Sequence, residues 1–196
     1  MLASMARTYE RPPWRIELTR RPGVASVAPG GVLADLVART LDTAGAPSPA
    51  TCGLVLADDA ELTRLNERAM GIPEPTDVLA FPLLPVSAFP PHPAADRRDS
   101  SAGRPTGAQP GADGLSFVLP PGESTHLGEI VVSVERAVAQ AEQGRGGQTG
   151  DVRWSAADEL RLLVAHGVLH LCGWDHAGTE EGAAMRALER ELLVGR

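Results

Sequence analysis

The sequence has no lysine, so all 18 of its strongly basic side chains are arginines. Aromatic residues make up only 4% of the chain, and a hydrophobic core must therefore be built mainly from Leu, Val and Ala. The net charge of −7 excludes a broad basic surface that would attract nucleic acid over the whole molecule. Any contact with nucleic acid has to come from a local patch or from a bound metal ion.

Long hydrophobic runs are also absent from the chain. No stretch reaches the roughly 18 apolar residues needed to span a bilayer, and the N-terminal residues lack the apolar segment of a signal peptide. The two cysteines, Cys52 and Cys172, lie in unrelated contexts, which suits a reducing compartment better than a disulfide scaffold. We therefore expect a cytoplasmic protein that does not act with a membrane.

The rest of the chain alternates predicted strands with predicted helices. Strand patterns cover residues 14–20, 51–58, 77–81 and 128–134, and helical spacing of apolar residues covers 30–45, 58–70, 134–144, 155–173 and 179–193. Two segments lack either pattern: residues 1–12, a predicted flexible tail, and residues 84–125, which hold eight of the 17 prolines. We predict one α/β domain with a mixed sheet over residues 13–196, carrying 84–125 as a disordered insertion.

Three of the five histidines, His166, His170 and His176, lie within eleven positions. Residues four apart share one face of a helix, and Gly173 is a natural helix end, after which the chain can bring His176 back. Three neutral imidazoles with a fourth position open to water describe a catalytic zinc site. We predict one Zn²⁺ per chain at these histidines, with Asp175 as a candidate to orient an imidazole.

Two other kinds of zinc site share part of this pattern. The spacing H-x3-H-x2-G-x2-H also occurs in metzincin proteases, but these carry a glutamate general base where this chain has Gly167. A closed structural site needs a fourth protein ligand. The nearby thiol, Cys172, is six residues past His166, about 240° around a helix, so we predict that it points into the core.

Three motifs resemble those of a known family. The stretch HGVLHLCGWDH (166–176) resembles the H-G-x-L-H-L-x-G-x-D-H signature of the YbeY endoribonucleases. PTDVLAFP (75–82) resembles that family's P-T-D-V-L-S-F-P, and LGEIVVS (127–133) resembles its L-G-D-I-x-I-S. The motifs occur in the family's order, and the resemblance covers about residues 14–193 apart from the predicted insertion.

The resemblance implies a zinc-dependent, single-strand-specific endoribonuclease that acts in 16S rRNA 3′-end maturation and ribosome quality control. It implies cleavage of RNA phosphodiesters by a zinc-activated water or hydroxide, with the small ribosomal subunit and ribosome-assembly factors as partners. The implied fold is a mixed, mostly parallel four-stranded sheet surrounded by helices. His166, His170 and His176 carry over as the metal ligands.

One departure from the family and one catalytic role stay open. The family often has an arginine five positions before the proline of its P-T-D motif, where this chain has Met70, and nearby Arg68 is a candidate phosphate contact. The general base is either Asp175 or hydroxide on the zinc, and attack by the RNA 2′-OH is a further route. A metzincin-like peptidase and a non-enzymatic ribosome-assembly factor with a zinc staple are the alternative functions.

Overall fold

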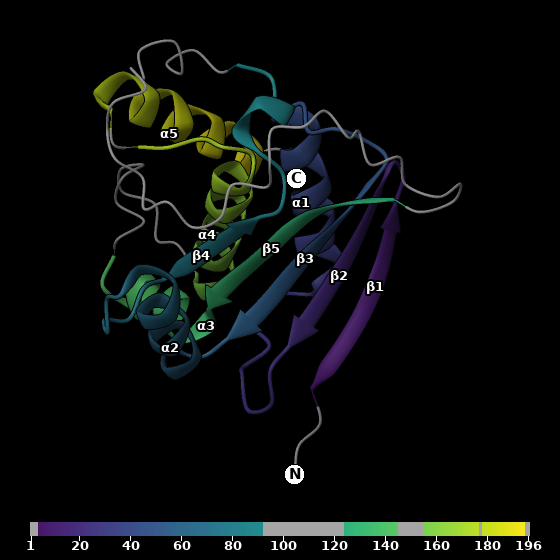
Figure 1. Cartoon of the computed structure of the whole chain (residues 1–196). Helices are drawn as coiled ribbons and strands as arrows, with labels where there is room; N and C mark the ends of the chain where they lie inside the picture. Colours follow the sequence, from purple (N-terminus) through teal and green to yellow (C-terminus); the bar gives the residue numbers. More distant parts are fainter. Residues whose placement is uncertain (1–3, 92–123, 145–154, 177, 195–196) are drawn as a thin grey trace.

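The computed structural model describes residues 4–91, 124–144, 155–176 and 178–194. Its elements alternate along the chain much as the sequence predicts (Figure 1). They are β1 (Met5–Arg11), β2 (Trp14–Arg20), α1 (Gly30–Thr43), β3 (Ala50–Ala57), α2 (Asp59–Met70), β4 (Val78–Pro82), the short 3-10 helix η1 (Val86–Ala88), β5 (Thr125–Ser133), α3 (Val134–Glu142), α4 (Ala156–Leu171) and α5 (Thr179–Val194).

The strands form one mixed sheet in the order β1-β2-β3-β5-β4. The two inner pairings, β2 with β3 and β3 with β5, are parallel. The two outer pairings, β1 with β2 and β4 with β5, are antiparallel. The expected four-stranded, mostly parallel sheet is therefore wrong in two respects: among the described residues the sheet has five strands, and half of its pairings are antiparallel.

The strand missing from the expectation is β1, which lies within the predicted flexible tail of residues 1–12. It pairs with β2 from Met5 opposite Arg20 to Arg11 opposite Trp14. Most side chains of β1 are exposed, since it is an edge strand and forms little of the core. Its sequence therefore lacks the alternation of buried and exposed residues that reveals β2.

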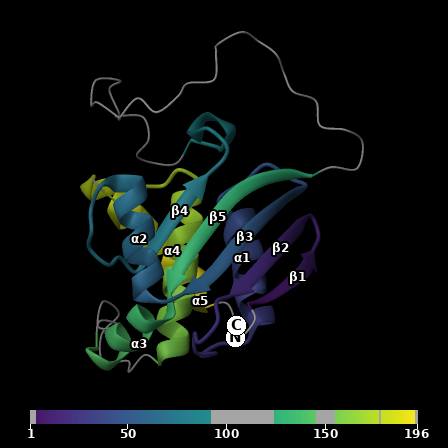
Figure 2. The same cartoon turned by 60° about the horizontal axis from the view of Figure 1, so that its bottom comes forward.

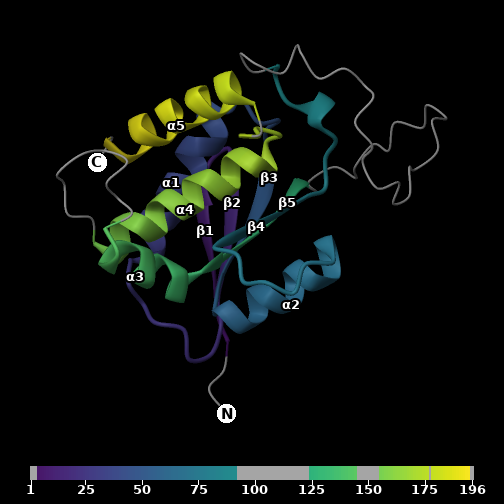
Figure 3. The ribbon, with the colours of Figure 1, turned by 90° about the vertical axis from the view of Figure 1, so that its left-hand side faces the viewer.

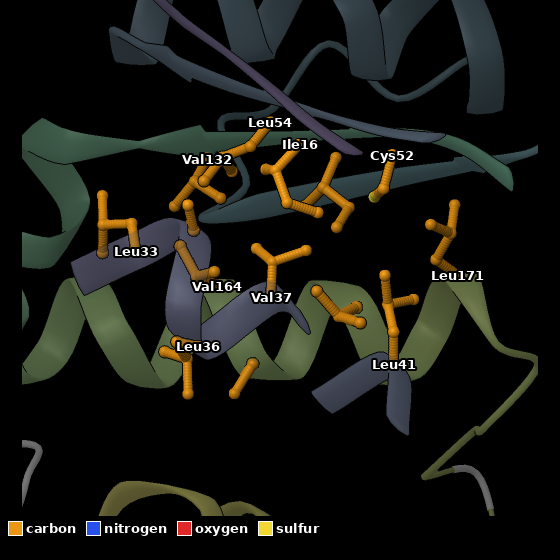
Figure 4. Close-up of a cluster of buried hydrophobic side chains, with 14 of the residues drawn as sticks. Ile16, Leu33, Leu36, Val37, Leu41, Cys52, Leu54, Val132, Val164 and Leu171 are labelled. Carbon is orange, nitrogen blue, oxygen red and sulfur yellow. The ribbon is translucent and has the colours of Figure 1, made fainter. Parts of the chain in front are cut away.

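Helices cover the sheet in unequal layers. Helices α1 and α4 lie on one face, α5 lies outside α4, and α2 covers the other face (Figure 3). Between the sheet and the first helix layer, Ile16, Leu54 and Val132 from the strands pack with Val37 of α1 and Val164 of α4 (Figure 4). Both faces of β3 are buried, which explains its continuous apolar sequence. Helix α4 is thus fixed in the centre of the molecule.

Several helix ends carry side-chain or glycine caps. Ser155 and Asp158 form a capping box at the start of α4. Asp58 caps α2, which ends at Gly71 in the left-handed conformation. Helix α3 packs beside the start of α4 (Figure 2). No helix in the described parts of the chain is long and apolar enough to cross a membrane.

The predicted insertion of residues 84–125 is structured at both of its ends. Leu84 packs against the core, Phe89 is only 7% exposed, and β5 already begins at Thr125. The predicted insertion is too long at both ends. At its start, prolines at positions 85, 90 and 91 interrupt the apolar pattern that would have indicated a structured segment. Residues 92–123 lie outside the described part of the chain.

We predict that replacing residues 92–122 with a short Gly/Ser linker leaves cooperative unfolding intact, because closure entropy changes only slowly with loop length. The contrasting variant Phe89→Ala should lower the free energy of unfolding by about 3 kcal/mol, because it empties a buried site. Thermal and urea unfolding of both variants beside the wild type measure the two effects. Loss of cooperative unfolding in the linker variant would show that residues 92–122 are part of the core.

Candidate metal centre

Two of the three clustered histidines lie on the last turns of α4. His166 and His170 are one turn apart, and both are half-buried. Their imidazole Nε2 atoms lie 2.9 Å apart, so the two rings point at one shared position. On the opposite side of the same turns, Val168 and Leu171 are buried in the core. This packing fixes the backbone positions from which both imidazole rings project.

Gly173 turns the chain back after α4. It has a φ of +88°, its N–H donates to the His170 carbonyl, and the N–H of Trp174 donates to the Leu169 carbonyl. These bonds close the helix with a left-handed residue, as glycine allows. The turn returns His176 to the helix, and one ligand atom from each of the three histidines lies within 4.8 Å of the others.

The outer nitrogens of the two helical histidines determine which tautomers are present. His166 Nδ1 lies 2.7 Å from Glu189 Oε1, and His170 Nδ1 lies 2.8 Å from the Trp174 carbonyl oxygen. A carbonyl oxygen only accepts hydrogen bonds, so His170 Nδ1 carries the hydrogen, and His166 Nδ1 carries it when the Glu189 carboxylate is the acceptor. Both Nε2 atoms then present lone pairs to each other, and a proton or a cation between them is required.

A divalent ion with a preference for imidazole fits this arrangement. Zinc binds histidine nitrogen at about 2.0–2.1 Å in tetrahedral geometry, with donor atoms roughly 3.3 Å apart. Burial lowers the pKa of His170 below its usual value, and the neighbouring His166 lowers it further. His170 is therefore held in the neutral form that a metal ion needs. His176 is exposed, which leaves one side of the centre open.

The thiol of Cys172 and the imidazole of His126 both lie outside the cluster. Cys172 is 1% exposed and belongs to the main core cluster, as predicted. Burial raises the pKa of its thiol to about 12, so it stays protonated and is a poor metal ligand. His126 lies on β5, where its Nε2 atom is 4.0 Å from Glu129 Oε1. Neither residue belongs to the three-histidine group.

Asp175 holds the loop that carries the third histidine. Its Oδ1 atom accepts the N–H of His176 at 2.8 Å, and its own N–H donates to Glu181 Oε1 at 2.9 Å. Asp175 thus sets the path of the backbone at His176. Its expected role, orienting an imidazole ring directly, stays a prediction.

A cavity of about 260 Å³ adjoins the centre and is lined by His166 and His176. The other lining residues come from α4, from α5 and from the position just before β4: Asp77, Glu159, Leu162, Leu163, Gly182, Met185, Arg186 and Glu189. Arg68 is not among them and lies on α2, across the sheet (Figure 3). Glu189 and Arg186 are not among the site residues that the sequence predicts, although a glutamate within the apolar stripe of a helix is an unusual feature that could have revealed Glu189.

A family model described as endoribonuclease YbeY matches residues 30–195. The chain belongs to the YbeY endoribonuclease family. It is similar to proteins of that name from Roseiflexus castenholzii (36% identical over 88% of this chain and 86% of that protein) and Symbiobacterium thermophilum (37% identical over 80% of each chain). A third relative of that name, from Salinispora tropica, is 38% identical over 91% of this chain and 94% of its own length.

The three YbeY-like motifs form one unit in space. The second motif forms β4 and the third forms β5, which pair antiparallel from Val78 opposite Val132 to Pro82 opposite Gly128. Helix α4, with the first motif, packs on both strands. Asp77 of the second motif lines the cavity, and its Oδ2 atom accepts the Gln140 side-chain amide at 3.1 Å.

Gly167 separates this YbeY-family chain from the metzincin pattern for a reason of packing. A Cβ atom at Gly167 would lie 2.5 Å from Ile130 Cγ2 and 2.8 Å from Val78 Cγ2. The position therefore faces the sheet at very close range and has no room for a side chain. A glutamate at this position would point into the β4–β5 surface and could not serve as the peptidase base.

We predict that alanine at His166, His170 or His176 removes the metal from the purified protein, since each substitution deletes one of three donors. Cys172→Ala should keep the full metal content, because that sulfur is packed in the core. Metal stoichiometry by mass spectrometry and coordination by X-ray absorption test both statements. Sulfur in the coordination shell of the wild type would contradict the three-histidine site.

Proposed function

We propose that this chain is a zinc-dependent endoribonuclease that cleaves single-stranded RNA during maturation of the 16S rRNA 3′ end and in ribosome quality control. The observation that carries the proposal is the pair of histidine Nε2 atoms held 2.9 Å apart, with a third histidine beside them. The YbeY relatives supply the reaction class. We further propose that this chain acts in the cytoplasm on the small ribosomal subunit, together with ribosome-assembly factors.

The proposed chemistry uses the open side of the centre. His166, His170 and His176 would hold one ion and leave a coordination position free. A bound zinc ion would lower the pKa of a bound water toward about 7 and polarise a phosphoryl oxygen. Asp175 is proposed to act by positioning His176, because its Oδ1 atom accepts the His176 N–H.

The charges around the cavity favour one side for the RNA phosphate. Asp77, Glu159 and Glu189 place carboxylates along the cavity wall, which repel phosphate. Arg186 is the one arginine among the lining residues, and its exposed guanidinium forms no hydrogen bond or salt bridge within the described residues. A phosphate entering between Arg186 and the exposed His176 would meet the guanidinium and the ion together.

We predict that the wild type loaded with zinc cleaves a single-stranded RNA and leaves the matching duplex and an unstructured peptide intact. His170→Ala should lose the cleavage, because it lacks one metal donor. Product end groups should be analysed in the same assay, because they distinguish attack by water from attack by the 2′-OH. Cleavage that persists in His170→Ala, or that survives removal of zinc by a chelator, would contradict the proposal. Zinc retained without any cleavage would instead favour the zinc staple.

The arginine variants test where the phosphate binds. We predict that Arg186→Ala lowers the cleavage rate about tenfold or more at unchanged zinc content, because a charge-assisted hydrogen bond to the phosphate is lost. Arg68 stays a proposed contact for RNA away from the cleaved bond, so Arg68→Ala should have a smaller effect. Rates across a salt series measure both. Equal rates for Arg186→Ala and wild type at every salt concentration would remove Arg186 from the site.

A further inference from the structure

Helix α5 buries two carboxylates where a covering helix ordinarily has apolar side chains. Glu181, Met185 and Glu189 recur every four residues and form one stripe toward the protein interior. They are 4%, 1% and 7% exposed. Glutamate is rarely buried unless it is paired, because removing its charge from water is costly. The stripe therefore needs partners that compensate these two charges.

Both carboxylates have partners at the metal centre. Glu189 Oε1 lies 2.7 Å from His166 Nδ1, the ring nitrogen turned away from the shared position. Glu181 Oε1 accepts the N–H of Asp175 at 2.9 Å, one residue before His176. The two glutamates, two turns apart on α5, thus act on two different ligands: one on a ring, the other on a backbone.

We propose that α5 positions the metal ligands, with Glu189 fixing the tautomer and ring orientation of His166 and Glu181 fixing the loop that carries His176. With Glu189 Oε1 as the acceptor of the Nδ1 hydrogen, 2.7 Å away, the Nε2 lone pair of His166 is left for the ion. Glu189 is a positioning residue in this scheme, since it acts through His166. The inference rests on the proposed metal centre and adds to it the element that holds its geometry.

The arrangement gives the three ligands different supports. His170 receives its hydrogen-bond partner from the Trp174 carbonyl, which belongs to the same turn that ends α4. His166 depends on a side chain from another helix, 23 residues further along the chain. A change at position 189 should therefore disturb His166 alone, while the helix end around His170 stays as it is.

A merely structural role for Glu189 predicts a different result from a positioning role. Removing one member of a buried charged pair destabilises a protein when the other is left as an uncompensated buried charge. His166 is only half-buried and can stay neutral, so this penalty does not arise when Glu189 is replaced by an apolar side chain. If Glu189 only joined α5 to α4, Glu189→Leu would change unfolding and metal affinity together. If it positions His166, the metal affinity falls while the metal-free protein stays as stable as the wild type or becomes more stable.

The experiment measures Zn²⁺ and Co²⁺ affinity of the purified full chain against a competing chelator, together with urea unfolding of the metal-free protein. We expect Glu189→Leu to bind both ions about 10- to 100-fold more weakly, with no loss of stability in the metal-free form. Glu189→Gln keeps an oxygen that accepts the Nδ1 hydrogen, so its affinity should lie between those of Glu189→Leu and the wild type. Glu191→Leu, at an exposed position of the same helix, is the matched control and should bind like the wild type.

Several results would overturn the inference, and one of them would also overturn the proposed function. Unchanged affinity in Glu189→Leu, or a loss no larger than in Glu191→Leu, would leave Glu189 without a role at the centre. A loss of affinity that is accompanied by a loss of stability in the metal-free protein would assign Glu189 to the packing of α5. A wild type that binds neither ion would overturn the proposed function as well. If Glu189→Leu binds the metal as tightly as the wild type and still cleaves RNA in a metal-dependent way, the positioning role alone is overturned.

Discussion

Two imidazole nitrogens meet at the end of α4 with both lone pairs turned inward. The 2.9 Å distance between His166 Nε2 and His170 Nε2 is favourable only when a proton or a cation lies between them, because the outer nitrogens already donate to Glu189 and to the Trp174 carbonyl. The outer partners thus exclude the tautomers in which the rings would turn their hydrogens inward. Hydrogen bonding thus favours a proton or a metal ion between the two rings.

The packing of α4 holds these two imidazole rings close together. Helix α4 packs between the sheet and α5, and its side chains Val164, Val168 and Leu171 belong to the main core. Gly167 brings the helix so close to β4 and β5 that a Cβ atom would meet Ile130 and Val78. A dense interior resists small displacements. The two rings are therefore held with their Nε2 atoms close together, at a position that a proton or a metal ion can occupy.

The sequence predicts the parts of this site that depend on local spacing. The histidines at positions i and i+4 and the helix end at Gly173 are such features, and the structure brings the three histidines together. Strand β1 is not predicted because an exposed edge strand shows no alternation of apolar and polar residues. The number of parallel pairings is overestimated because the sequence of one strand does not determine the direction in which it pairs. Glu189 and Arg186 were missed because their roles depend on how α5 crosses α4, which is a tertiary contact.

The acidic character of the chain is compatible with an RNA substrate because charge at the centre depends on the ion. Without a metal, the cavity presents Asp77, Glu159 and Glu189 against Arg186, and the whole chain carries a net charge of −7. Phosphate is repelled by such a surface at short range. A divalent ion on the three histidines would offset these carboxylates and place positive charge at the open side, next to the exposed His176 and Arg186. Affinity for RNA and occupancy by metal are then linked through charge, and by the reciprocity of linked equilibria RNA bound at the site tightens the hold on the ion.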